Sequence, residues 1–180
     1  MCVIRVFVTL KITDNVARTA LHTLHTRLGC PSVSRLQRSE FWELHFPRLE
    51  ETQALQVTER LVHQTALFMN PNKHLCKIEV HPRSVQDNSA AASPFPSDAS
   101  ILVSDRIDGK ADGTLEFLRG HTAPSEHPSN LLRGIWWDLQ FSHSDKRHIQ
   151  ETVSSLAVAQ SRHEGLFANP HYQDHRLFLP

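Results

Sequence analysis

Thirteen histidines are the first residues of this chain to invite a chemical interpretation, because paired imidazoles are common zinc ligands. His22 and His25 are three residues apart, and His171 and His175 are four apart. A catalytic zinc site needs a third protein ligand, and the chain has no His-Glu-x-x-His motif. We therefore expect surface histidines and predict no metal site.

Nucleophilic and nucleotide-dependent chemistry also lacks its usual motifs. Gly-x-Ser-x-Gly, Walker and dinucleotide-binding glycine patterns are absent. Cys2, Cys30 and Cys76 form no Cys-x-x-Cys pair, so neither a disulfide framework nor a zinc knuckle is predicted. Cys30 follows an expected helix end, where a thiolate is disfavoured. We expect no catalytic residues and no cofactor bound by this chain.

The charge balance argues against a broad nucleic-acid or anionic-membrane surface. Lysine plus arginine and aspartate plus glutamate number 19 each. Tryptophan rings can stack on nucleic-acid bases, and the chain has Trp42, Trp136 and Trp137. The basic groove that such binding needs is missing. The chain shows no secretory pattern and no apolar run of membrane-spanning length, so we expect a cytoplasmic protein.

The strongest signal in the chain is a repeat. Phe41–Phe46 (FWELHF) is matched by Trp136–Phe141 (WWDLQF), and Leu67–Pro71 (LFMNP) is matched by Leu166–Pro170 (LFANP). The two matches occur in the same order, with shifts of 95 and 99 positions. They predict two copies of one small unit.

Apolar periodicity predicts the same order of elements in each half. In the first half we expect strand 3–10, helix 14–28, strand 33–46, helix 50–69 and strand 75–80. A turn near Arg38-Ser39 that splits the middle strand stays open. In the second half we expect strand 101–104, a short helix 113–119, a loop 120–130, strand 133–141, helix 142–163 and strand 175–179.

These elements predict an α/β (α+β) fold made of two tandem β-α-β-α-β units. The units span residues 1–82 and 100–180, and a Ser/Ala/Pro-rich linker covers residues 83–99. A unit of this size buries a modest share of its surface, so we expect the halves to pair with each other. They would form a pseudo-twofold sheet assembly with helices packed on the sheets.

The order of these motifs resembles the PurS family. The residues that carry the resemblance are Val6–Lys11, the helix ending Leu28-Gly29, the aromatic–Glu-Leu strand, Leu67–Pro71, Gly134 and Leu166–Pro170. Of the family's Asp-Pro-Gln-Gly, only Asp14 and Asp108 remain. The family's Gly-Lys before the middle-strand aromatic is Ser39-Glu40 in the first half and Gly134-Ile135 in the second.

The resemblance implies a role without chemistry of its own. PurS proteins are small dimeric subunits of phosphoribosylformylglycinamidine synthase, which acts in purine biosynthesis. They bridge the ATP-dependent synthase (PurL-like) subunit and the glutaminase (PurQ-like) subunit and support ammonia transfer between them. A tandem chain resembles such a dimer made covalent, and the complex would use ATP, Mg²⁺ and glutamine.

Pairs of equivalent residues in the two halves are the candidates for partner or interface contacts. The candidates are Lys11, Arg38, Trp42 and Asn70 of the first half and Arg106, Arg133, Trp137 and Asn169 of the second. We expect the tryptophans to hold the two halves together. The alternative from another class is a paired α/β regulatory domain that binds a small metabolite at the interface between the units.

Overall fold

A computed structural model describes residues 2–81, 95–142, 145–161 and 164–179 of the chain. The first half contains β1 (Cys2–Leu10), α1 (Asn15–Thr26), β2 (Val33–Phe46), α2 (Glu51–Gln64) and β3 (His74–His81). The second half contains β4 (Ala99–Asp105), α3 (Gly109–His121), the 3₁₀ turn η1 (Pro124–Glu126), β5 (Asn130–Phe141), α4 (Lys146–Ala157) and β6 (Gln173–Phe178). Both halves therefore follow the predicted β-α-β-α-β order.

The strands form an antiparallel six-stranded sheet in the order β3-β1-β2-β5-β4-β6. Within the first half, Val6 of β1 lies opposite Trp42 of β2 and Ile78 of β3. Within the second half, Ile101 of β4 lies opposite Trp137 of β5 and Leu177 of β6. The predicted mixture of strands and helices is confirmed as an α+β fold, and each half places its first strand between its other two.

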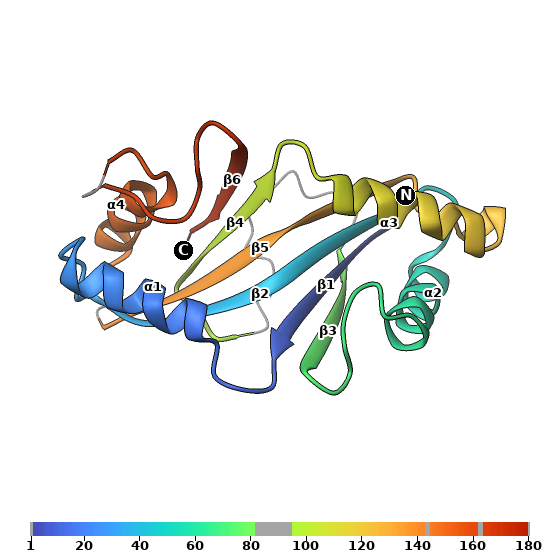
Figure 1. The fold of residues 1–180 in the computed structure, drawn as a ribbon, viewed down its shortest axis with the longest axis horizontal. Coiled ribbons are helices and arrows are strands. Elements are labelled where there is room, and N and C mark those ends of the chain that lie inside the picture. The colour runs from blue at the N-terminus through green and yellow to red at the C-terminus, as the bar shows by residue number, and fades with distance from the viewer. Residues whose placement is uncertain (1, 82–94, 143–144, 162–163, 180) are drawn as a thin grey trace. The chain divides into compact units, whose positions relative to one another are not determined.

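The chain divides into two compact units, and each unit draws on both halves of the sequence. Unit 1 consists of residues 1–12, 40–85 and 107–134, and unit 2 consists of residues 13–39, 86–106 and 135–180. Helix α1 therefore belongs to the same unit as β4 and β6, whereas α3 belongs to the same unit as β1 and β3 (Figure 1). Strands β2 and β5 contribute one segment to each unit.

The core of unit 1 lies between one face of its strands and helices α2 and α3. Alternate residues of β1 and β2 point into this core, as the two-residue period of a strand requires. Its strand members include Ile4, Val6, Val8, Trp42, Leu44 and Phe46. Leu61 of α2 and Leu118 of α3 pack in the same cluster. The helix of the second half is thus held by strands of the first.

The core of unit 2 repeats this arrangement with helices α1 and α4. Its strand members include Ile101, Val103, Trp137, Leu139 and Phe141. Ala17 and Leu24 of α1 pack there, together with Ile149 and Val153 of α4. The spacing of these helical residues by four and seven places them on one face of each helix. A helix of the first half is thus held by strands of the second.

Strand β2 is continuous from Val33 to Phe46, so the turn considered near Arg38-Ser39 does not occur. The polar run in its middle suggested a break in the strand. The structure satisfies those charges instead, because Arg38 pairs with Asp14 and Glu40 pairs with Lys110 and Arg133. Polar residues that find partners need no turn to reach solvent.

Helix α2 ends at Gln64, six residues before the Asn70-Pro71 signal that was expected to end it. Thr65 leaves helical geometry at φ −120° and ψ 150°, and its hydroxyl donates to the Leu61 carbonyl at 2.6 Å. The expectation of a helix to Met69 is wrong because Phe68 and Met69 are buried in the unit 1 core. Burial of these side chains outweighs local helix preference.

The other boundaries also differ from those predicted. Helix α3 runs over Gly109–His121, longer than predicted, because Asp108 caps its first turn. Helix α4 covers Lys146–Ala157, shorter than the predicted 142–163. Most of the predicted linker lies outside the described residues, and Ala99 already belongs to β4. Within the described part of the chain, no helix is long and apolar enough to cross a membrane.

Two glycines adopt left-handed backbone geometry, and they differ in the space around them. Gly29, at φ 63°, ends the turn after α1, and no atom lies within 4 Å of the position that a Cβ would occupy there. Gly165, at φ 73°, would place a Cβ against the main chain of Val158. The close approach at Gly165 allows the loop after α4 to hydrogen-bond to the end of that helix, as in the 2.9 Å bond from Leu166 N to Leu156 O.

The two glycines predict different costs for the same substitution. We expect Gly29→Ala to lower the free energy of unfolding by about 1–2 kcal/mol, the cost of left-handed geometry alone. Gly165→Ala adds a main-chain clash, so we expect a loss of about 3 kcal/mol or more. Urea unfolding of both variants measures the difference. Equal losses would show that the Gly165 loop yields without cost.

Candidate functional site

The first helix of each half begins at an aspartate, whose carboxylate binds both the N-terminus of that helix and an arginine. Asp14 Oδ1 accepts from Val16 N and Ala17 N at 2.8 and 3.2 Å. Its other oxygen, Oδ2, accepts from Arg38 Nε at 2.9 Å. One side chain therefore caps the helix and fixes the strand.

Asp108 makes the equivalent contacts at the start of α3. Its Oδ1 accepts from Lys110 N and Ala111 N at 3.0 and 3.1 Å. Its Oδ2 lies 3.5 Å from Arg133 Nη1, a longer contact than the one at Asp14. Arg133 stands in β5 where Arg38 stands in β2, so the two halves repeat the pairing.

Each arginine lies over a tryptophan that comes from the other half of the sequence. The Arg38 guanidinium carbon is 6.0 Å from the Trp137 ring centroid, and that of Arg133 is 5.6 Å from Trp42. Each tryptophan also contacts a phenylalanine: the ring centroids of Trp137 and Phe167 are 5.1 Å apart, and those of Trp42 and Phe68 are 5.2 Å apart. We call each set of aspartate, arginine, tryptophan and phenylalanine an Arg–Trp cluster, and each unit contains one.

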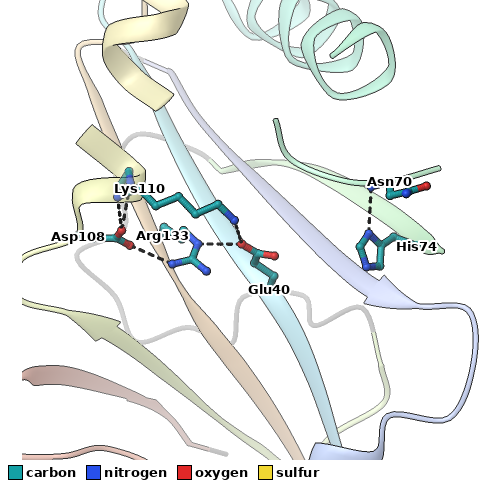
Figure 2. Close-up of polar contacts among 7 residues, drawn as sticks. Glu40, Asn70, His74, Asp108, Lys110 and Arg133 are labelled. Atoms are coloured by element: carbon teal, nitrogen blue, oxygen red, sulfur yellow. Dashed lines mark hydrogen bonds and ion pairs between the residues drawn. The ribbon is translucent and has the colours of Figure 1, made fainter. Parts of the chain in front are cut away.

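The cluster of unit 1 has two further charges, shown in Figure 2. Glu40 Oε1 accepts from Arg133 Nε at 2.8 Å and from Lys110 Nζ at 3.1 Å. The Lys110 ammonium also lies 5.3 Å from the Trp42 ring centroid. In the cluster of unit 2 the matching positions are Ile135 and Val16, which carry no charge. The two clusters thus share a plan and differ in electrostatics.

Glu40 is partly buried and contacts two cations, which act on its pKa in the opposite direction to burial. Burial alone raises its pKa, but hydrogen bonds from Arg133 and Lys110, with their positive charges, bring the pKa below its ordinary value. Burial likewise acts to lower the pKa of Arg133, but its contacts with Glu40 and Asp108 raise that pKa overall. The two cations and two carboxylates compensate each other, so this cluster presents no excess charge to a ligand.

The remaining predicted residues lie at two equivalent turns. Asn70 Oδ1 accepts from Asn72 N at 2.9 Å, and Asn70 N donates to His74 Nδ1 at 3.0 Å (Figure 2). Asn169 Oδ1 accepts from His171 N at 3.0 Å, and Asn169 N donates to Gln173 Oε1 at 2.9 Å. Both asparagines therefore build Asx turns that lead into the last strand of their half.

The cations after the first strands are bound to these turns. Lys11 Nζ donates to the Pro71 carbonyl at 2.7 Å, and Lys11 N donates to the Lys73 carbonyl at 2.9 Å. Arg106 Nε donates to Asp174 Oδ1 at 2.9 Å, and Arg106 N donates to the Tyr172 carbonyl at 2.9 Å. Both cations remain exposed to solvent.

A second polar cluster, which the sequence did not reveal, lies on the opposite face of β1 and β2. Arg5 Nε donates to Glu43 Oε2 at 2.9 Å, and His45 Nε2 lies 3.0 Å from Glu43 Oε1. Burial would raise the Glu43 pKa, but the His45 hydrogen bond and the Arg5 charge lower it to about 2. The cross-strand partners were hidden because they are 38 positions apart in the sequence.

The matching positions of the second half carry a weaker form of this cluster. Ser100 Oγ donates to Asp138 Oδ1 at 2.7 Å, and Trp136 Nε1 donates to the same oxygen at 2.8 Å. A buried carboxylate thus recurs on the middle strand, with neutral donors in place of the cation. Alternation along the middle strand places Glu43 and Asp138 on the face of the sheet that the helices do not cover. This alternation is the sequence signal that could have located them.

Metal-ligating side chains and thiols are the remaining groups that could take part in chemistry. Among the described residues, no three side chains of histidine, cysteine, aspartate or glutamate are placed to hold a metal ion. Burial raises the pKa of the Cys30 thiol and raises that of Cys76 to about 11. Both thiols therefore favour the protonated form, which is the less nucleophilic one.

An open hollow of about 450 Å³ lies along α1 in unit 2. Its lining residues are Asn15, Val16, Thr19, Ala20, Thr23 and Leu166. None of these side chains is charged, so the hollow offers no counter-ion to a charged metabolite. In unit 1 the matching helix carries Lys110 and Phe117 where α1 carries Val16 and Thr23.

Comparison with known proteins leaves the resemblance as an inference from residues. No protein-family model matches this chain. No curated protein matches it significantly.

The contacts of the two arginines predict unequal effects of removing them. Arg133→Met removes a partner from two carboxylates, Glu40 and Asp108, so we expect a loss of about 2 kcal/mol in the free energy of unfolding. Arg38→Met leaves Asp14 still accepting two backbone N–H groups, so we expect about 1 kcal/mol. Urea unfolding at pH 7 compares the two variants, and a larger loss for Arg38→Met would contradict this account.

The Glu43 pKa predicts how stability depends on acid. The folded pKa of about 2 is below the ordinary 4.5, so ionised Glu43 stabilises the fold fully above pH 4.5. That contribution, of about 3 kcal/mol at most, is lost as the pH falls from 4.5 through 2. Glu43→Gln should be less stable at pH 7 and should show a shallower decline over this interval, measured by urea unfolding. Parallel pH profiles would refute the assignment.

Proposed function

We propose that this chain is a non-catalytic bridging subunit of phosphoribosylformylglycinamidine synthase in purine biosynthesis. It is a tandem PurS-like protein, equivalent to a PurS dimer made covalent, with its halves related by a pseudo-twofold axis. In the cytoplasm it holds a PurL-like synthase and a PurQ-like glutaminase together, so that ammonia from glutamine reaches the synthase. ATP, Mg²⁺ and glutamine bind to those partners.

The repeated Arg–Trp cluster is the observation that carries this proposal. Each cluster takes its arginine from one half and its tryptophan from the other, and the exchange is reciprocal: Arg38 with Trp137, and Arg133 with Trp42. Reciprocal contacts between equivalent residues are the mark of an isologous dimer interface. Their occurrence inside one chain supports a dimer whose two subunits have become covalently joined.

The Asx turns add support from a different part of each half. The main chain of Lys11 bonds to Lys73 and that of Arg106 bonds to Tyr172, with the two shifts of 95 and 99 positions seen in the sequence repeat. The repeat therefore extends from short motifs to hydrogen bonds. It includes the Lys/Arg and Asn-Pro positions on which the PurS resemblance rests.

A metabolite sensor is less well supported. Recognition of an amino acid or nucleotide needs charged or strongly polar groups that converge on the ligand. The hollow beside α1 has an uncharged lining, and the charges of both Arg–Trp clusters are engaged with each other. A saturable rise in the unfolding temperature with a single metabolite, in the absence of any protein partner, would favour the sensor instead.

Assembly with separate synthase and glutaminase subunits tests the proposal. Purified chain is mixed with a PurL-like and a PurQ-like protein, ADP, Mg²⁺ and glutamine, and the mass of the complex is measured by sedimentation. We expect one complex that contains all three proteins and that fails to form when this chain is omitted. Absence of a complex at concentrations of about 10–100 µM would overturn the proposal.

Activity provides the matched control. We expect the chain to raise the glutamine-dependent rate of the mixture by about tenfold or more, because ammonia must pass between two subunits that it brings together. The rate with free ammonium as nitrogen source should change little, since that reaction needs no bridge. An equal rise in both rates would indicate activation of the synthase alone.

A further inference from the structure

Two exposed isoleucines stand at equivalent places in the two halves. Ile12 follows β1 and is 76% exposed, and Ile107 follows β4 and is 89% exposed. Each comes directly after a cation, Lys11 or Arg106. Single apolar residues on a surface are common, so exposure alone carries no functional meaning. Functional meaning comes instead from their equivalent positions and from the rigid loops that carry them.

The loops that carry these isoleucines are fixed at both ends. On the strand side, the main chains of Lys11 and Arg106 each bond to an Asx turn, and their side chains bond to the Pro71 carbonyl and to Asp174 of β6. On the helix side, Asp14 and Asp108 cap α1 and α3 within two residues of the isoleucine. A loop held in this way loses little backbone freedom when a partner buries its side chain.

The isoleucines match between the halves although several exposed positions of the helices that follow them do not. When α1 and α3 are aligned at their capping aspartates, the retained apolar residues are in the interior, such as Ala17 with Ala111 and Leu24 with Leu118. Exposed positions have changed even in charge, from Arg18 to Asp112 and from His22 to Glu116. Ile12 and Ile107 make no such contribution to either core.

We propose that Ile12 and Ile107 are anchor residues, each buried in an apolar pocket on a protein partner. The fold gives no reason to keep two exposed isoleucines at equivalent places, whereas a partner that reads both loops does. This inference rests on the proposed function, which makes the synthase and glutaminase subunits the partners. It adds the places at which the bridge holds them.

The adjacent cations indicate the chemistry at the rim of the pockets. Within the described residues, Lys11 bonds to carbonyl oxygens and forms no ion pair. Arg106 pairs with Asp174, but the two side chains are 52% and 66% exposed, so water screens that pair. Both cations are placed to meet a carboxylate beside the apolar pocket. The partner surface is therefore apolar at its centre and acidic at its edge.

Affinity measurements on full-length variants test the anchors. The dissociation constants of Ile12→Ser, Ile107→Ser and the double variant are measured by calorimetry against purified PurL-like synthase and PurQ-like glutaminase. We expect each single change to weaken binding of at least one subunit by about tenfold, and the double change to weaken assembly by about a hundredfold. Thermal unfolding should be unchanged, because neither side chain packs in the core.

Phe117→Thr is the matched control. It removes another partly exposed apolar side chain and installs the residue that the first half carries at the equivalent position, Thr23. Assembly should be unaffected by this change. If it weakens assembly as much as Ile12→Ser does, the effect reflects general loss of apolar surface and the anchor assignment fails.

The remaining outcomes separate the two proposals. Wild-type binding that survives the double isoleucine change overturns the anchors and leaves the bridging function intact. Absence of wild-type binding to either subunit overturns both. Loss of binding in the isoleucine variants, with unchanged unfolding temperature and an inert Phe117→Thr, establishes the anchors.

Discussion

The carboxylate that begins the first helix of each half is the constraint on which the rest of the structure depends. Asp14 and Asp108 each satisfy two backbone N–H groups with one oxygen and hold an arginine with the other. The arginine in turn lies over a tryptophan from the opposite half. A helix start, a strand and a core aromatic are thus fixed together. A helix placed this way packs on strands of the other half, which explains why each compact unit draws on both.

The two clusters show how far equivalent sites diverge while the fold persists. Unit 1 adds Glu40 and Lys110 and becomes a closed network of four charges, whereas unit 2 has Ile135 and Val16 at those places. The added pair introduces one charge of each sign, so the net charge of the cluster is unchanged. Glu40 is the more buried member of the added pair, at 25% exposed against 52% for Lys110, and it also has Arg133 as a partner. The pair couples a strand residue to a helix residue.

Much of the fold could be predicted from the sequence, because its signals there are local. Asp14 and Gly29 mark the ends of α1, and the alternation in Phe41–Phe46 gives the buried face of β2. The errors arose where distant residues decide. The polar middle of β2 suggests a turn, because the partners of Arg38 and Glu40 are distant in the sequence. Asp14 is 24 positions from Arg38, and Arg133 is 93 positions from Glu40. The site could be predicted only as a set of matched residues, since exchange of helices between the halves leaves no local signal.

The positions of the matched residues also separate structural roles from roles in recognition. Arg38 and Arg133 are engaged with carboxylates and rings, the two tryptophans are buried, and Asn70 and Asn169 are turn residues. A partner that used these side chains would have to break bonds of 2.8–3.0 Å on which the fold relies. Lys11 and Arg106 differ because they remain exposed while their main chains are fixed. Rigidity and exposure therefore coincide at the strand-to-helix loops, which makes these loops the places where the proposed partners could be bound without distorting the fold.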